Sequence, residues 1–252
     1  MVFCHGTPWS AALWRRIANA LSRDFTVYLW DMLGYGTSTM SEGQDVSLAA
    51  QGRLLVALLE HWKLAEPHVV AHDYGGAVAL RAHLLHGARY RTLALVDVVA
   101  LAPWGSEFFR LVAENASVFA RIPPPLHEAL VRAYISGAAY RPLTAECLDM
   151  LVAPWLGSSG QAAFYRQIEQ ADQRYTDEIE SLYPAVELPV LIAWGVEDVW
   201  IPVDRARRLA AAIPGAKLHL VEDAGHLIQL DAPEKLTATL QRWLLADAIR
   251  SR

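Results

Sequence analysis

Residues 69–77 of the chain read Val-Val-Ala-His-Asp-Tyr-Gly-Gly-Ala. An apolar, β-branched run ends abruptly at a turn with small residues, and the helix-forming segment 77–82 follows at once. Small residues around such a turn let a strand and a helix approach closely, so that one side chain is pushed out at the top of a sheet. The stretch therefore predicts a strand, a sharp turn and a helix that together present Asp73.

Asp73, at the tip of this turn, has the residue type of a carboxylate nucleophile. A carboxylate with an ordinary pKa of about 3.9 is ionised at neutral pH, whereas a serine needs a base to remove its proton. Its natural target is an sp³ carbon with a strained or good leaving group, as in epoxides and alkyl halides, because water can hydrolyse the resulting ester. The structural alternative is that Asp73 caps the helix that follows.

Composition indicates one domain without a nucleic-acid partner. With 252 residues and 54% hydrophobic content, the chain suits a single α/β domain with an inserted subdomain. The net charge is −5, and the lysines and arginines form no basic stripe. Cys4 and Cys147 lie far apart in apolar sequence, which favours reduced thiols in a cytoplasmic protein. We expect neither a signal peptide nor a membrane span.

Strand-like and helix-like segments alternate at both ends of the chain. Predicted strands cover residues 2–4, 26–30, 67–72, 92–99, 188–195 and 217–221. Predicted helices cover residues 11–21, 46–62, 77–82 and 233–246. This alternation predicts a mostly parallel central sheet flanked by helices, with ligands at the carboxyl ends of the strands. Polar side chains gather at those ends: His5, Asp31, His72, Asp73, Asp97, Asp198 and His226. Among them, Asp31 is expected to tie a loop together.

The middle of the chain has a different pattern. Residues 102–185 lack strand signals, and helix-like pieces at 106–120, 126–136, 144–153 and 160–171 are joined by proline and glycine. A helical insertion between two strands indicates a lid that excludes water and shapes a pocket. The sequence thus predicts a core of residues 1–101 and 186–252 with a lid of residues 102–185. The alternative is an appendage that binds a partner.

Four stretches make the chain resemble the α/β-hydrolase fold family over nearly its whole length. They are His5-Gly6-Thr7-Pro8, the turn at 71–76, Gly195-Val196-Glu197-Asp198 and Ala224-Gly225-His226. The resemblance implies the family's fold with a helical lid, or cap domain, and a catalytic triad of Asp73, Asp198 and His226. It also implies that the backbone N–H groups of Thr7 and Tyr74 hold an oxyanion. Asp97 is a rival for the role of Asp198, since it also lies at a strand exit.

An aspartate nucleophile makes the chain most similar to the epoxide hydrolases of this family. The resemblance implies that Asp73 attacks an epoxide and that His226, oriented by Asp198, activates the water that releases a vicinal diol. The expected partners are a small apolar epoxide and water, and neither a cofactor nor a metal ion is expected. The lid stretch 160–167 resembles the segment that carries a ring-opening tyrosine, which here is Tyr165. For a second donor, Tyr134, Tyr140 and the more distant His127 stay open.

Two other functions are compatible with the same residues. Haloalkane and haloacetate dehalogenases also use an aspartate, but they usually carry Trp or Arg directly after it, where this chain has Tyr74. Tryptophans could line either a halide site or an apolar epoxide pocket, among them Trp9, Trp104, Trp155 and Trp200. The third possibility is a receptor that binds small apolar molecules without turnover.

The amino end departs from the family pattern. Members of the family usually have two strands before the His-Gly turn, and here the turn follows within a few residues of Met1. Either the sheet lacks those strands or the sequence is truncated. If the strands are absent, the predicted strand 26–30 becomes an exposed sheet edge that could pair with another chain. We therefore expect a monomer or a homodimer across that edge.

Overall fold

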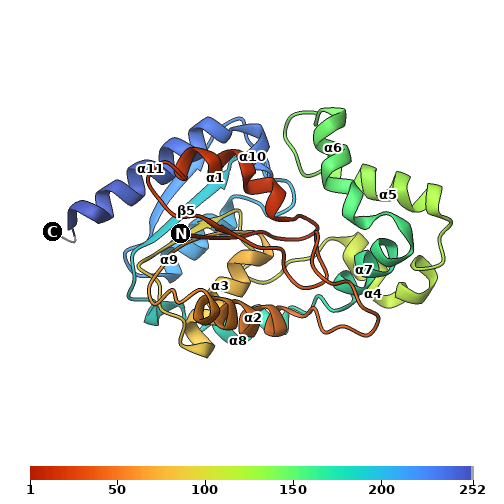
Figure 1. Ribbon diagram of the computed structural model, residues 1–252, viewed down its shortest axis with the longest axis horizontal. Helices are drawn as coiled ribbons and strands as arrows, with labels where there is room; N and C mark the ends of the chain where they lie inside the picture. Colours follow the sequence, from red (N-terminus) through yellow and green to blue (C-terminus); the bar gives the residue numbers. More distant parts are fainter. Residues whose placement is uncertain (251–252) are drawn as a thin grey trace.

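The computed structural model describes residues 1–250, with the side chains of residues 1–245. Its described part contains a six-stranded sheet in the spatial order β2-β1-β3-β4-β5-β6, with every neighbouring pair parallel. The strands are β1 (Val2–Cys4), β2 (Tyr28–Leu29), β3 (His68–His72), β4 (Thr92–Val96), β5 (Val190–Gly195) and β6 (Lys217–Val221). Figure 1 shows helices on both sides of this sheet and a further group of helices at one end. The predicted α/β architecture with a parallel sheet is confirmed.

Successive strand residues point into two apolar cores, one on each face of the sheet. Val69 and Val70, neighbours in β3, are both buried but belong to different cores. The Val70 side is covered by η1 (Ala11–Trp14), α1 (Arg15–Leu21), α10 (Ile228–Asp231) and α11 (Pro233–Arg250). The Val69 side is covered by α2 (Leu48–His61), α3 (Tyr74–His86), α8 (Arg174–Glu180) and α9 (Asp204–Ala212). Burial on both faces explains why the central strands are almost continuously apolar.

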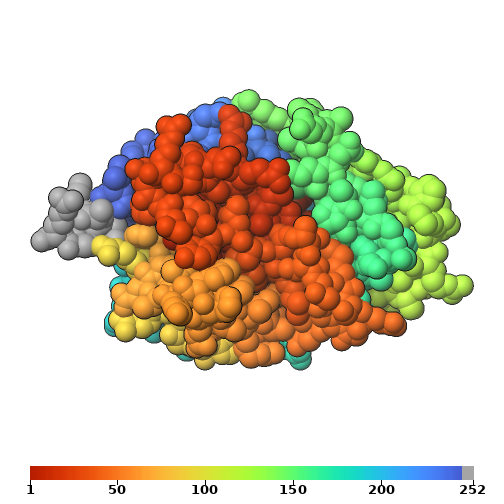
Figure 2. All heavy atoms as spheres, viewed as in Figure 1, coloured from red at the N-terminus to blue at the C-terminus, as the bar shows by residue number. Residues whose placement is uncertain are grey.

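Between β4 and β5 the chain leaves the sheet and builds the lid. Its helices are α4 (Glu107–Phe119), α5 (Pro124–Ser136), α6 (Ala145–Val152), η2 (Ala153–Trp155) and α7 (Gly157–Glu169). In Figure 2 these green atoms form a lobe at one end of the molecule, in contact with the N-terminal part of the chain.

The carboxyl end of the predicted lid range belongs to the core. Helix α8 packs against α3, where Arg81 forms an ion pair with Glu178 and donates a 2.6 Å hydrogen bond to the carbonyl of Tyr175. The chain then passes through η3 (Tyr183–Ala185) and re-enters the sheet. We therefore use "lid" below for residues 107–169 only.

Strands β2 and β4 are each three residues shorter than the sequence predicts. Strand β4 ends at Val96 instead of continuing to Val99, because Asp97 adopts φ of 44° and turns the chain. Strand β2 has only two residues and lies at one edge of the described sheet, where the sequence placed it. Very short edge strands offer few unpaired backbone groups to another chain. Pairing of two copies across this edge stays a prediction.

Two further observations concern the cysteines and the helices. Cys4 and Cys147 are both free thiols, as the sequence predicts. Within residues 1–250, none of the helices has both the length and the apolar character needed to cross a bilayer.

Candidate active site

Asp73 is held out at a strained turn between β3 and α3. It has φ of 50° and ψ of −121°, a region that residues other than glycine rarely occupy and that tends to be retained at functional sites. The turn also needs small neighbours. A Cβ on Gly75 would lie 2.5 Å from the carbonyl oxygen of His5, and a Cβ on Gly6 would lie 2.2 Å from Oδ1 of Asp73. The sequence therefore lets β1, β3 and α3 converge on one carboxylate.

The two oxygens of Asp73 have different surroundings. Oδ1 accepts a 2.6 Å hydrogen bond from the backbone N–H of Thr7, and Oδ2 lies 3.4 Å from Nε2 of His226. Among the described residues, this side chain forms no capping hydrogen bond with α3, so the capping alternative is wrong. Oδ1 thus occupies the position where the family resemblance predicts an oxyanion, and Oδ2 is left to react. The second predicted N–H, that of Tyr74, belongs to the first residue of α3.

His226 lies between two carboxylates. Its Nδ1 is 2.9 Å from Oδ2 of Asp198, whose Oδ1 accepts hydrogen bonds of 2.8 Å from the backbone N–H groups of Trp200 and Ile201. Burial alone would lower the pKa of His226. The charge of Asp198, the hydrogen bond to it and the nearby Asp73 outweigh burial and raise that pKa well above its ordinary value. The two carboxylates therefore favour the protonated imidazole in the free protein.

Asp97, the rival for the acid role, binds elsewhere. Its Oδ1 accepts a 2.8 Å hydrogen bond from the backbone N–H of Gly195. Burial, and then the charge of Asp198, raise the pKa of Asp97 well above its usual range. The geometry thus gives the contact with His226 to Asp198. Asp31 ties a loop as expected, since its carboxylate accepts from the N–H groups of Ala11 and Thr37 at 2.7 and 2.8 Å.

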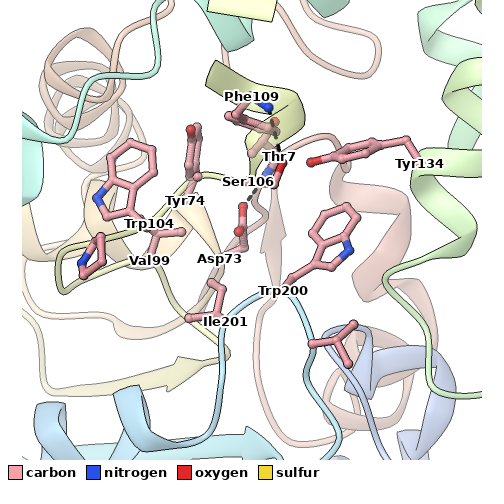
Figure 3. Close-up of a pocket in the computed structure, with 13 residues that line it drawn as sticks. Thr7, Asp73, Tyr74, Val99, Trp104, Ser106, Phe109, Tyr134, Trp200 and Ile201 are labelled. Carbon is pink, nitrogen blue, oxygen red and sulfur yellow. Dashed lines mark hydrogen bonds between the residues drawn. The ribbon is translucent and has the colours of Figure 1, made fainter. Parts of the chain in front are cut away.

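A cavity of about 250 Å³ opens above Asp73 (Figure 3). Its aromatic walls are Tyr74, Trp104, Phe109, Tyr134 and Trp200. Among the described residues that line this cavity, none is Lys or Arg. The walls therefore favour a small uncharged substrate and offer no cation to a carboxylate group.

Tyr165, the predicted ring-opening donor, lies away from the lining of this cavity. It is fully buried in α7, and its hydroxyl is 2.9 Å from Nδ1 of His127. The other ring nitrogen of His127 is 2.9 Å from the carbonyl of Trp155, so Nε2 carries the proton and Nδ1 accepts. The Tyr165 hydroxyl accordingly donates to His127.

Tyr134 is the lid tyrosine that points at the site. In Figure 3 its hydroxyl extends from α5 into the cavity, and its ring lies 4.6 Å from that of Trp200. Burial, and then the charge of Asp73, raise the pKa of Tyr134 well above its usual range, so the phenol keeps its proton and remains a donor. Tyr140, the other candidate, is 49% exposed and is not part of the lining.

Tyr74 lines the same cavity, but its hydroxyl is buried away from the open space. Its side chain is buried, and within the described chain its hydroxyl has no hydrogen-bond partner. Burial raises the pKa of Tyr74 well above its usual range, with smaller contributions from Tyr35 and Asp73. In the sequence, Tyr74 counts only as an argument against dehalogenation. Its position directly after Asp73 is the signal that could have identified it as part of the cavity wall.

Two contacts in the site are not apparent from the sequence. Trp200, considered only as a possible pocket wall, stacks on His226 with ring centroids 5.2 Å apart. Gln167 of α7 accepts a 2.6 Å hydrogen bond from the hydroxyl of Thr7, whose N–H binds Asp73. The lid therefore contacts Thr7, the residue whose N–H binds Asp73. Neither contact follows from a local motif, because each joins segments distant in sequence.

The site combines a carboxylate on a strained turn, a histidine held by a second carboxylate, and a backbone N–H bound to an oxygen of the first carboxylate. On an α/β fold, these three features define a hydrolase site. Comparison with known proteins agrees, since the model of the alpha/beta hydrolase family matches residues 1–239. The chain belongs to the α/β-hydrolase family.

Relatives of known structure or name support this membership. An alpha/beta hydrolase fold protein from Burkholderia ambifaria is 49% identical, with a TM-score of 0.92 over 95% of this chain and 88% of that one. Haloalkane dehalogenase 2 from Mycobacterium tuberculosis is 25% identical over 258 residues, 95% of this chain and 86% of that protein. A haloalkane dehalogenase from Bradyrhizobium elkani, 21% identical, has a TM-score of 0.83 over 99% of this chain and 90% of that one, which shows the fold.

Proposed function

We propose that this protein is an epoxide hydrolase that converts a small uncharged epoxide to a vicinal diol through an ester on Asp73. The observation that supports it most is the presence of a free carboxylate oxygen of Asp73 and the phenol of Tyr134 in one apolar cavity. An epoxide oxygen becomes an alkoxide when the ring opens, and it needs a donor that can also supply a proton. The phenol of Tyr134 keeps its proton at neutral pH and can give it to the more basic alkoxide.

The first step forms the ester. Oδ2 of Asp73 attacks the less hindered epoxide carbon, the carbon–oxygen bond of the ring breaks, and Tyr134 gives its proton to the departing oxygen. Oδ1 stays with the N–H of Thr7 and becomes the carbonyl oxygen of the ester. The nucleophile is therefore already seated in its oxyanion site before it reacts.

The second step hydrolyses the ester with water. Ester formation removes the negative charge of Asp73, which is one of the groups that keep His226 protonated. With that charge gone, His226 can release its proton and take one from water, which attacks the ester carbonyl. The N–H of Thr7 then stabilises the oxyanion. As the intermediate breaks down, His226 gives its new proton to the departing alkoxide oxygen, which frees the diol, and Asp73 loses its proton back to His226. Protons return to Tyr134 through solvent.

Dehalogenation of an uncharged haloalkane is the second candidate, because Haloalkane dehalogenase 2 is a relative of this chain. The same Asp73, Asp198 and His226 would serve both reactions. The phenol of Tyr134 favours the epoxide, since a halide leaves without a proton, and the indole N–H of Trp104 is already bound to Thr176 at 2.7 Å. Haloacids are disfavoured, since the cavity lining of the described chain provides no cation.

Parallel incubation with epoxides and haloalkanes decides between these reactions. We expect diol from a small aryl or alkyl epoxide and little halide from matched chloro- and bromoalkanes. Release of halide at the higher kcat/KM would make the protein a dehalogenase. Saturable binding of both classes without diol, halide or alkylated protein would identify a receptor without turnover.

Tyr134→Phe should slow ring opening roughly 100-fold, the typical effect of removing one donor to a developing oxyanion. This change keeps the ring and its contact with Trp200 and removes only the hydroxyl. Tyr165→Phe is the matched control, and we expect less than about a tenfold change, since that hydroxyl donates to His127. Rapid-quench mass spectrometry of the alkylated protein measures the step. The opposite ranking of the two variants would assign the donor to Tyr165.

The rate of ester hydrolysis should fall at mildly acid pH, whereas the rate of ester formation should not. The pKa of His226 is raised by the carboxylates in the free protein and falls when Asp73 is esterified. Below the pKa of His226 in the ester, the histidine stays protonated, and hydrolysis should slow about tenfold for each further pH unit. The wild-type protein should accordingly accumulate the ester at mildly acid pH, measured by intact mass after quenching. A hydrolysis rate independent of pH would contradict this role of His226.

A further inference from the structure

Asp97 is a buried carboxyl group that the two chemical steps above do not use. It is the first residue after β4, and it has φ of 44°, in the left-handed region that residues other than glycine enter less often. Its backbone N–H donates to the carbonyl of Ala193 at 3.1 Å, and its Oδ1 accepts from the N–H of Gly195 at 2.8 Å. These bonds across to β5 fix the carboxyl group in one orientation.

The other oxygen of Asp97 meets a second carboxyl group. Oδ2 is buried, and within the described chain no donor reaches it, while the side chain of Asp198 is within hydrogen-bonding reach. Asp198 already accepts from Trp200, Ile201 and His226. The titratable groups that face Asp97 are thus Asp198 and His226. Two carboxyl groups in contact and away from solvent repel unless one of them carries a proton.

We propose that Asp97 works as a neutral carboxylic acid that donates its Oδ2 hydrogen to Asp198 and so limits the negative charge around His226. It is a positioning residue, because it acts on the histidine through Asp198. For the catalytic consequence, this inference rests on the proposed ester mechanism. The assignment of the proton itself does not depend on any reaction.

The charge around His226 explains why a neutral Asp97 matters. In the free protein His226 faces the charges of Asp73 and Asp198, and ester formation removes one of them. An ionised Asp97 would replace the lost charge and keep the proton on His226, which would prevent it from acting as a base. Burial and the charge of Asp198 raise the pKa of Asp97 well above its usual range, in agreement with a retained proton.

Infrared spectroscopy of the resting protein tests the proton directly. At neutral pH we expect the carbonyl band of a protonated carboxylic acid, shifted when aspartate is labelled with ¹³C. The band should be present in the wild type and in Asp73→Asn and missing in Asp97→Asn. A wild-type spectrum without a protonated aspartate would overturn the inference, whether or not the protein is an epoxide hydrolase.

Kinetics of the two steps tests the consequence. Asp97→Asn preserves shape, an acceptor for Gly195 and an N–H donor for Asp198, so ester hydrolysis should change by less than about tenfold. The matched change Asp198→Asn removes the charge that orients His226 and should slow hydrolysis by roughly 100-fold or more, with ester accumulation. Ester accumulation in a folded Asp97→Asn protein, with hydrolysis retained in Asp198→Asn, would make Asp97 the charged acid of the site and overturn the inference.

Discussion

Replacing His226 with Gln should stop turnover after the first chemical step and leave the protein esterified on Asp73. The reason is the division of work between the two residues. In the proposed mechanism Asp73 attacks without a base, because its carboxylate is already ionised, whereas water needs His226 to remove a proton. We expect ester hydrolysis to slow by roughly 10² to 10⁴, the usual contribution of a general base. Ester formation should persist.

Intact mass spectrometry with a reactive epoxide measures this result, and peptide mapping should place the added mass on residue 73. His61→Gln, at the exposed end of α2, is the matched control and should turn over like the wild type. If the His226 variant were folded and carried no added mass with an epoxide that the wild type consumes, the covalent mechanism would be wrong.

Asp73→Asn should slow ester formation by roughly 10⁴-fold or more. The amide keeps the size of the carboxylate and an oxygen for the N–H of Thr7. It loses the charge and offers an NH₂ group in place of Oδ2, so no nucleophile faces the cavity. Asn also tolerates positive φ, which lets it adopt the backbone conformation of Asp73.

The same variant should stay folded and be at least as stable as the wild type, because active sites hold charges and strained residues that stability alone would not select. Thermal unfolding followed by circular dichroism measures this. Single-turnover analysis in ¹⁸O-labelled water is the companion experiment. In the wild type, repeated cycles should place heavy oxygen in the carboxylate of residue 73. Turnover by the Asp73→Asn protein, or no label in the wild type, would show that Asp73 is structural.

The sequence predicts the fold and the position of the triad because both depend on local patterns. Each of Asp73, Asp198 and His226 follows an apolar strand, and the carboxyl ends of parallel strands meet at one edge of a sheet. Asp97 shares that position, so spacing alone could not choose the acid. The choice depends on which carboxylate reaches Nδ1 of His226, and that distance is set by the loop geometry after β4 and β5.

The lid was less predictable than the core. Its helices are evident from composition, but the face that each helix turns toward Asp73 depends on how the helices pack together. Tyr165 matches a local motif, yet its hydroxyl is used by His127 of the neighbouring helix, while Tyr134 points into the cavity. Helix α8 shows the same limit, since its pattern does not reveal whether it packs on the lid or on α3.

The hydrogen bond between Gln167 and Thr7 has a consequence for protein engineering. A second bond joins the same two parts, since the backbone N–H of His226 donates to the carbonyl of Ala138, between α5 and α6. Transplanting the cap of another family member onto this scaffold would therefore change both catalytic loops as well as the substrate pocket. Chimeras that preserve these two junctions should retain chemistry while their selectivity is redesigned.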